Sequence, residues 1–231
     1  QPFNEQFTLS AGTTLDATRS TDYELRAQGE DDYVEQVTLS FPLGATYNTV
    51  KAPLDPQAGN RVSLGVEPGI SFGDGEASYT RITSSASTYR KISDRLVAAV
   101  RAEAGTFLGD EGVPVDRKFF AGGGGSVRGF EYQSLSPTDS DGNIIGGDAM
   151  FAASLELRWR KSERWGYVAF VDSGYAADSI DEAFGEMRTS FGLGVRFYPG
   201  FGPVRFDIAT PLDRRDGEDP VQIYVSIGQS F

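Results

Sequence analysis

The chain has 231 residues, and its 33 acidic and 21 basic side chains leave a formal net charge of −12. This negative field repels phosphate and argues against general nucleic-acid binding. Cysteine and histidine are absent, which removes disulfides, thiolate and imidazole metal ligands, and every catalytic triad that needs either residue. The sequence therefore predicts no catalytic residue, no metal site and no cofactor.

Apolar residues recur at every second position along the chain, which is the period of a β-strand. In chain order the rows cover residues 7–17, 33–47, 62–72, 78–90, 95–106, 151–159, 168–172, 189–197, 204–209 and 221–231. They predict about ten strands of roughly 9 to 13 residues, longer than soluble strands and typical of tilted membrane-crossing ones. The expected fold is all-β, an antiparallel transmembrane β-barrel.

A soluble β-sandwich or a lipocalin-like barrel is the alternative, because alternate apolar residues can also face a packed core. Two features favour the membrane. The charges opposite the apolar rows are mostly arginine with aspartate or glutamate, as in a crowded polar lumen. Aromatic residues gather at strand ends, where amphipathic rings favour the headgroup interface; they are Tyr89, Trp159, Trp165, Tyr167, Tyr198 and Phe201.

The longest connection between predicted strands runs over residues 107–147 and is rich in glycine. A connection of this length in a compact domain is usually functional or disordered, and two aromatic pairs argue against disorder. Its glycine run lacks the Gly-Lys-Ser/Thr ending of a phosphate-binding loop. Residues 139–143 are acidic, but they lack the glycine position and the final glutamate of an EF-hand, so an acidic surface turn is the better interpretation.

The middle of this connection, residues 119–130, has the sequence FFAGGGGSVRGF. It resembles the signature loop of the bacterial outer-membrane insertase superfamily, the BamA/TamA-like surface-antigen barrels, in which an aromatic-Gly-Gly stretch precedes Val/Ile-Arg-Gly-Phe/Tyr. Further matches lie at 54–56, 154–156, 170–174 and 202–206 and at the final aromatic residue. The Leu-Asp-Pro turn at 54–56 and the last row make the chain look most like the C-terminal barrel region of TamA.

The resemblance implies a set of interacting residues in the lumen. The loop motif is Val127, Arg128, Gly129 and Phe130, and the expected partners on the wall are Glu156, Phe170, Asp172 and Gly174. The residues themselves support the same arrangement: if Phe170 and Asp172 face the lumen, the Asp172 carboxylate needs a cation. Arg128 could offer its planar fork to Asp172, with Glu156 as a second acceptor.

The last predicted strand looks like the targeting signal of the same family. Its apolar row is Val221, Ile223, Val225 and Ile227, followed by Gly228 and Phe231. We expect this strand to run from 221 to 231, to offer unpaired backbone groups to an incoming strand, and to be loosened by Gly228. The family barrel has roughly sixteen strands after periplasmic POTRA domains, so residues 1–231 look like its C-terminal portion, with 107–147 as a lumen-entering loop.

The implied function is a non-enzymatic protein of the Gram-negative outer membrane. It would insert or secrete autotransporter-type β-barrel proteins through lateral opening and β-augmentation. Its partners would be outer-membrane lipids, unfolded outer-membrane clients and an inner-membrane-anchored protein that spans the periplasm. The alternative function is a two-partner-secretion pore that exports a soluble protein through the lumen. A barrel enzyme is disfavoured, because such sites generally need histidine.

Overall fold

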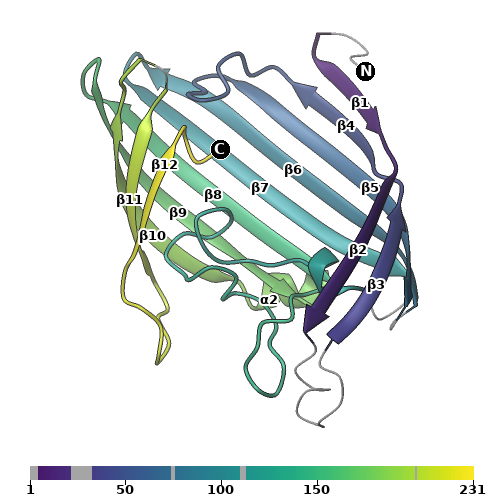
Figure 1. Cartoon of the computed structure of the whole chain (residues 1–231). Helices are drawn as coiled ribbons and strands as arrows, with labels where there is room; N and C mark the ends of the chain where they lie inside the picture. Colours follow the sequence, from purple (N-terminus) through teal and green to yellow (C-terminus); the bar gives the residue numbers. More distant parts are fainter. Residues whose placement is uncertain (1–4, 22–32, 74–75, 110–112, 201) are drawn as a thin grey trace.

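The computed structural model describes residues 5–21, 33–73, 76–109, 113–200 and 202–231. Twelve strands form one antiparallel sheet that curves like part of a barrel wall (Figure 1). They are β1 Phe7–Ala11, β2 Thr14–Thr21, β3 Tyr33–Ser40, β4 Leu43–Asn48, β5 Gly59–Gly73, β6 Ala77–Ser93, β7 Leu96–Gly109, β8 Ala149–Arg160, β9 Trp165–Ala177, β10 Arg188–Phe197, β11 Val204–Pro211 and β12 Gln222–Ile227. The predicted interface aromatic Phe201 lies outside the described residues.

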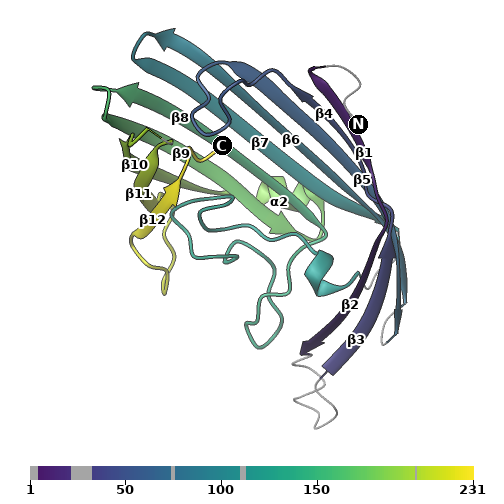
Figure 2. The ribbon, with the colours of Figure 1, turned by 45° about the horizontal axis from the view of Figure 1, so that its top comes forward.

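The first two predicted rows each contain a break that divides them into two strands. β1 pairs with β4, and β2 pairs with β3. The breaks fall at Gly12 and Pro42 and lie side by side, since the Gly12 N–H donates to the Pro42 carbonyl at 2.9 Å. Proline has no N–H with which to continue a ladder. The path from β1 through β4 to β12 therefore holds the expected ten strands, and the β2–β3 hairpin bends away from it (Figure 2).

The two faces of the sheet differ in chemistry, as the alternation predicts. Leu155 and Leu193 point outward and are exposed, whereas Glu156 and Arg196 on the same strands point inward and are fully buried. An apolar convex face with a polar concave face is what a barrel in lipid requires. The predicted all-β antiparallel fold is confirmed.

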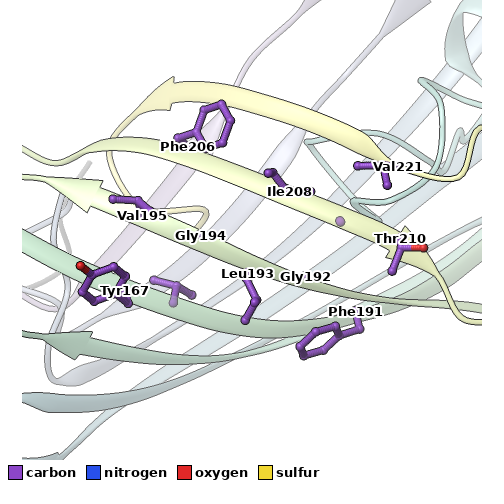
Figure 3. Close-up of a pocket in the computed structure, with 12 residues that line it drawn as sticks. Tyr167, Phe191, Gly192, Leu193, Gly194, Val195, Phe206, Ile208, Thr210 and Val221 are labelled. Carbon is purple, nitrogen blue, oxygen red and sulfur yellow. The ribbon is translucent and has the colours of Figure 1, made fainter.

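The convex face carries a groove of about 480 Å³ across β9, β10 and β11 (Figure 3). The side chains that stand around it include Tyr167, Phe191, Leu193, Phe206 and Ile208. Only Tyr167 among these carries a polar atom, so the groove presents hydrocarbon to its surroundings. This surface is suited to contact with lipid acyl chains.

Residues 113–148 cross the concave side of the sheet (Figures 1 and 2). A buried apolar cluster holds this loop on the wall and comprises Phe119, Ala121, Val127, Phe130 and Leu135 of the loop with Ala152 of β8 and Ala176 of β9. The described part of the chain has only short helices, η1 Val115–Arg117 at the start of this loop and α2 Ile180–Gly185. Among the described residues, no helix has both the length and the apolar character needed to cross a bilayer.

The last strand ends earlier than the sequence predicts. Gly228 has a φ of +92°, in the left-handed region that favours glycine, and its N–H donates to the Pro203 carbonyl at 2.7 Å. The chain then turns inward, where the Phe231 carbonyl accepts a hydrogen bond of 3.1 Å from Arg158. The expected strand over 221–231 is therefore wrong at both ends: β12 begins at Gln222, and Gly228 terminates it instead of loosening it from within.

Candidate functional site

The expected contact between Arg128 and Asp172 is present. Asp172 points inward from β9, and both residues are 1% exposed. The Arg128 guanidinium donates from Nε to Asp172 Oδ2 at 2.7 Å and from Nη2 to Oδ1 at 2.9 Å. The Arg128 backbone N–H adds a third bond to Oδ2 at 3.1 Å. This two-point geometry is the strong form of an arginine–carboxylate pair.

Two further carboxylates lie around the same guanidinium. Arg128 Nη1 is 2.7 Å from Glu156 Oε1 and 3.1 Å from Asp207 Oδ2. The guanidinium carbon lies 3.4 Å from the centre of the Phe170 ring, so the predicted aromatic-x-Asp motif supplies a cation–π contact as well as a charge. The sequence predicted Glu156 as the second acceptor and missed Asp207.

The charge of Arg128 is secured by these contacts. Burial alone would lower the pKa of Arg128, but the hydrogen bond to Asp172 and the negative charges of Glu156, Asp172 and Asp207 raise it above its ordinary value. The side chain therefore stays a cation although it is removed from water. The directions of these hydrogen bonds fix the position of the buried guanidinium.

The wall around Arg128 contains more arginines. We call seven linked residues the inner-wall cluster: Arg128, Glu156, Arg158, Asp172, Arg196, Arg205 and Asp207. Arg158 Nε binds Glu156 Oε2 at 2.7 Å, and Arg196 Nη1 binds Asp207 Oδ1. Ser154 completes the surroundings of Asp172, because its hydroxyl donates to Oδ1 at 2.5 Å. The cluster joins the loop to β8, β9, β10 and β11.

The rest of the loop motif connects the loop to the last strands. The Tyr224 hydroxyl on β12 accepts a bond of 2.9 Å from the Gly129 N–H and donates to the Phe130 carbonyl at 3.0 Å. Gly129 has a φ of +95° and lies against Ser190 of β10, whose hydroxyl donates to the Arg128 carbonyl. Glycine is required there by the backbone and by the close approach. The loop position and the position of β12 are thus linked.

The remaining predicted wall residue, Gly174, belongs to a different contact. It lies on the inner face of β9 opposite Ala152 of β8 and Arg188 of β10. A side chain at Gly174 would meet the Phe151 carbonyl at 2.6 Å, so the glycine allows close strand packing. The role of Gly174 as a partner of the loop motif stays a prediction.

The segment after β12 is held at the other end of the lumen by the predicted Leu-Asp-Pro turn. The Gln229 N–H donates to the Leu54 carbonyl at 3.1 Å. The Gln229 side chain donates to Asp55 at 2.9 Å and accepts from Arg196 at 2.9 Å. Asp55 also pairs with Arg160 of β8 at 2.9 Å. The turn between β4 and β5 therefore meets the inner-wall cluster through the end of the chain.

The loop between β11 and β12 is tied to the sheet by a second group of charges. Arg188 Nη2 lies 3.0 Å from Glu218, and Arg188 Nε lies 2.5 Å from Asp213. Partial burial acts to raise the pKa of Glu218, but the hydrogen bonds from Arg188 and Arg215 hold it below its ordinary value. The ionised form of Glu218 is the one that this loop stabilises.

Metal ligands are not grouped in the described ranges: no set of three histidine, cysteine, aspartate or glutamate residues could hold an ion there. The acidic turn predicted at 139–143 is closed by its own side chains. Asp139 accepts bonds of 2.8 and 2.9 Å from the backbone and side-chain amides of Asn143. These carboxylate oxygens thus serve the turn.

A curved antiparallel sheet with an apolar convex face, a polar concave face and an arginine-anchored loop inside defines the wall of an outer-membrane-type β-barrel. The whole chain, residues 1–231, matches the Omp85 superfamily domain, and the chain belongs to this superfamily. The predicted Gram-negative outer-membrane location is confirmed by this membership. The prediction that the protein is not an enzyme agrees with this membership.

Similar proteins include BamA and CdiB. Over 152 residues, 62% of the chain, it is 36% identical to outer membrane protein assembly factor BamA of Nitratidesulfovibrio vulgaris, of which it covers 19%. The crystal structure of BamA from Haemophilus ducreyi lacking POTRA domains 1–3 matches with a TM-score of 0.74 and 20% identity, over 96% of this chain and 51% of that one. CdiB from Acinetobacter baumannii matches with a TM-score of 0.60 and 15% identity, over 94% and 38%.

The family model establishes the superfamily, and the likeness to the solved structures establishes the fold. The chain spans about a fifth of the length of the curated relative and about half of the Haemophilus ducreyi structure. The relatives named above are BamA and CdiB, so they do not show the finer resemblance to TamA that was drawn from the sequence motifs.

Proposed function

We propose that this chain is the barrel portion of an outer-membrane protein assembly factor that receives strands of unfolded clients at the edge of β12. The observation that carries this proposal is the position of β12 as the last strand of the sheet. It pairs with β11 on one side in the described part of the chain, and in this proposal a client strand is added on its other side. Such an edge is a template for an added strand.

The pattern of β12 defines what can pair with it. Ile223, Val225 and Ile227 face outward and are exposed, while Tyr224 faces inward toward the loop motif. An added strand continues this division, with apolar residues toward lipid and polar residues toward the lumen. This alternation is the pattern of outer-membrane β-strands, which makes them the class of client that the edge suits best.

The loop motif supplies a means of controlling the edge. Arg128 anchors the loop to the wall, and the next two residues of the motif bind Tyr224 of β12. Release of the loop would remove these two hydrogen bonds from the edge strand. We therefore assign the inner-wall cluster a holding role, in which the docked loop keeps β12 in place until a client arrives.

The narrower assignments rest on the sequence motifs. The Leu-Asp-Pro turn and the last apolar row favour autotransporter-type clients and a periplasm-spanning, inner-membrane-anchored partner. Outer-membrane lipids would cover the convex face. The sequence placed the lumen-entering loop at 107–147, but β7 extends to Gly109 and β8 begins only at Ala149. In this proposal residues 113–148 act as that loop, within a single barrel domain that includes residues 1–231.

A second candidate function is a secretion pore for a soluble protein. A polar recess in the concave face favours this function. It is lined by Ser63, Arg81, Thr83, Ser85 and Glu103, among others. A chain passing through the lumen would contact these side chains rather than the edge of β12.

The test is reconstitution of the full-length protein in liposomes. One arm adds a urea-unfolded outer-membrane β-barrel and measures its folding by heat-modifiable gel mobility. The other arm adds a soluble unfolded protein and measures its entry into the liposomes as protection from external protease. Faster folding of the barrel client than in empty liposomes is expected. Entry of the soluble protein without faster client folding would favour the secretion pore and contradict the assembly function.

A further inference from the structure

Arg205 is the member of the inner-wall cluster with the weakest pairing. It points inward from β11 and is 8% exposed. Its Nε and Nη1 atoms are buried and have no hydrogen-bond partner within the described structure. The carboxylate nearest in the cluster is Asp207, whose Oδ2 lies 3.9 Å from Arg205 Nε. This distance is beyond a hydrogen bond.

Asp207 is occupied by other arginines. Its Oδ1 pairs with Arg196 Nη1, and its Oδ2 accepts from Arg128 Nη1 at 3.1 Å. Arg196 Nη2 also reaches Oδ2, at 3.4 Å. Arg128, which comes from the loop, therefore takes a position that Arg205 on the neighbouring wall could otherwise fill.

The balance of charge changes with the loop. With the loop docked, the cluster has four arginines and three carboxylates, so it carries one surplus positive charge. The wall alone has three arginines and three carboxylates, because Arg128 belongs to the loop. Buried charge without a partner is costly. The wall is thus balanced when Arg128 is absent and overcharged when it is present.

We propose that Arg205 is the replacement counterion of the wall, which pairs with Asp207 when Arg128 leaves. A movement of about 1 Å would bring Arg205 Nε into hydrogen-bond range of Asp207 Oδ2. The cluster then has two alternative pairings, one for the docked loop and one for the released loop. Such a pair of discrete arrangements is what a conformational switch requires. This inference concerns the loop equilibrium and does not depend on the cargo.

The proposal predicts an effect of unusual sign. Arg205→Gln removes the surplus positive charge of the docked state. It also removes the cation that would pair with Asp207 in the released state, so the loop should be released from the wall less often. Removal of Arg128 should do the opposite. Arg205→Lys keeps a cation near Asp207 and should resemble the parent. If Arg205 merely supports the fold, its loss should loosen the loop instead.

The experiment measures how often the loop opens. The chain contains no cysteine, and Val127 is 0% exposed in the docked loop. In the full-length protein in detergent micelles, Val127→Cys therefore gives a thiol in this domain whose alkylation by a maleimide reports release of the loop. Arg205→Gln should slow alkylation by roughly three- to tenfold, the range expected for residues that modulate such an equilibrium.

Controls make the outcome decisive. Arg61→Gln, which removes an exposed arginine of β5 outside the cluster, should leave the rate unchanged. In an Arg128→Ala background, Arg205→Gln should no longer slow alkylation, because Arg128 and Arg205 no longer compete for Asp207.

Heat-modifiable mobility verifies that each barrel is folded, and Arg205→Met serves as a second neutral variant. Unchanged or faster alkylation in both neutral variants overturns the proposal, as does slowing that persists without Arg128. Saturable protection by inorganic sulfate that Arg205→Gln abolishes would mark an anion site and would also overturn it.

Discussion

Replacing Arg128 with alanine removes the cation that three buried carboxylates share. Loss of one partner from a buried ion pair costs about 3 to 5 kcal/mol, whereas an exposed pair is worth under about 1 kcal/mol. Arg128 is 1% exposed, so the first range applies. We expect about 3 kcal/mol, near the lower limit, because Asp172 keeps its bond from Ser154 and Asp207 can turn to Arg205. That loss corresponds to a shift of the loop equilibrium by more than about 100-fold toward release.

A double-mutant cycle with Asp172→Ala measures this contact directly. The readout is the rate of protease cleavage within the loop of the folded protein, converted to a free energy of loop release. The two substitutions should be non-additive by at least about 1 kcal/mol, since both remove the same pair. Arg128→Lys should fall between the parent and alanine, because lysine keeps the charge but lacks the two-point fork. Effects that add within about 0.5 kcal/mol would show that Arg128 and Asp172 do not act as a pair.

Three further predictions concern the surroundings of the cluster. Tyr224→Phe removes two hydrogen bonds to the loop. It should lower the free energy of loop opening by about 1 to 2 kcal/mol, which is observed as faster cleavage of the loop. Gly192→Ala places a methyl group against the Phe170 ring. This overpacking should lower the free energy of unfolding by about 1 to 3 kcal/mol, which is measured as a lower thermal unfolding midpoint. The lowered pKa of Glu218 means that its pairing with Arg188 stabilises the β11–β12 loop at neutral pH and is lost as pH falls through that pKa. Cleavage of this loop should therefore rise in acid, and Glu218→Gln should abolish the rise; the same acid response in the variant would contradict the assignment.

The alternation of the sequence predicts most of the sheet because the two faces of each strand meet different surroundings. It places Glu156 and Asp172 on the inner face correctly, and the need of a buried carboxylate for a cation pairs them with Arg128. Pro42 was available as a signal for the broken strands, since proline cannot donate to a ladder. The alternation within one strand, however, does not show that the break at Gly12 lies beside the break at Pro42.

Other features depend on the curvature of the sheet, which a single row does not encode. Asp207 alternates with apolar neighbours as Asp172 does, but its contact with the loop arises only when β11 curves toward the loop residue Arg128. The end of β12 depends on the backbone of Gly228, whose positive φ breaks a row that otherwise appears continuous to Phe231. Inner-face charges counted across all strands, rather than within one motif, would have indicated both Asp207 and Arg205.

Clients join the barrel at β12 in the proposed function, and site-specific cross-linking can detect this step. Ile223 of β12 and Leu193 of β10 are matched outward residues, 59% and 58% exposed. Each is changed to cysteine in the full-length protein, and an assembling client carries one cysteine in its terminal strand. We expect a disulfide with Ile223→Cys during assembly and none above background with Leu193→Cys. Equal cross-linking at both positions, or cross-linking at Leu193→Cys alone, would contradict the proposed joining at β12.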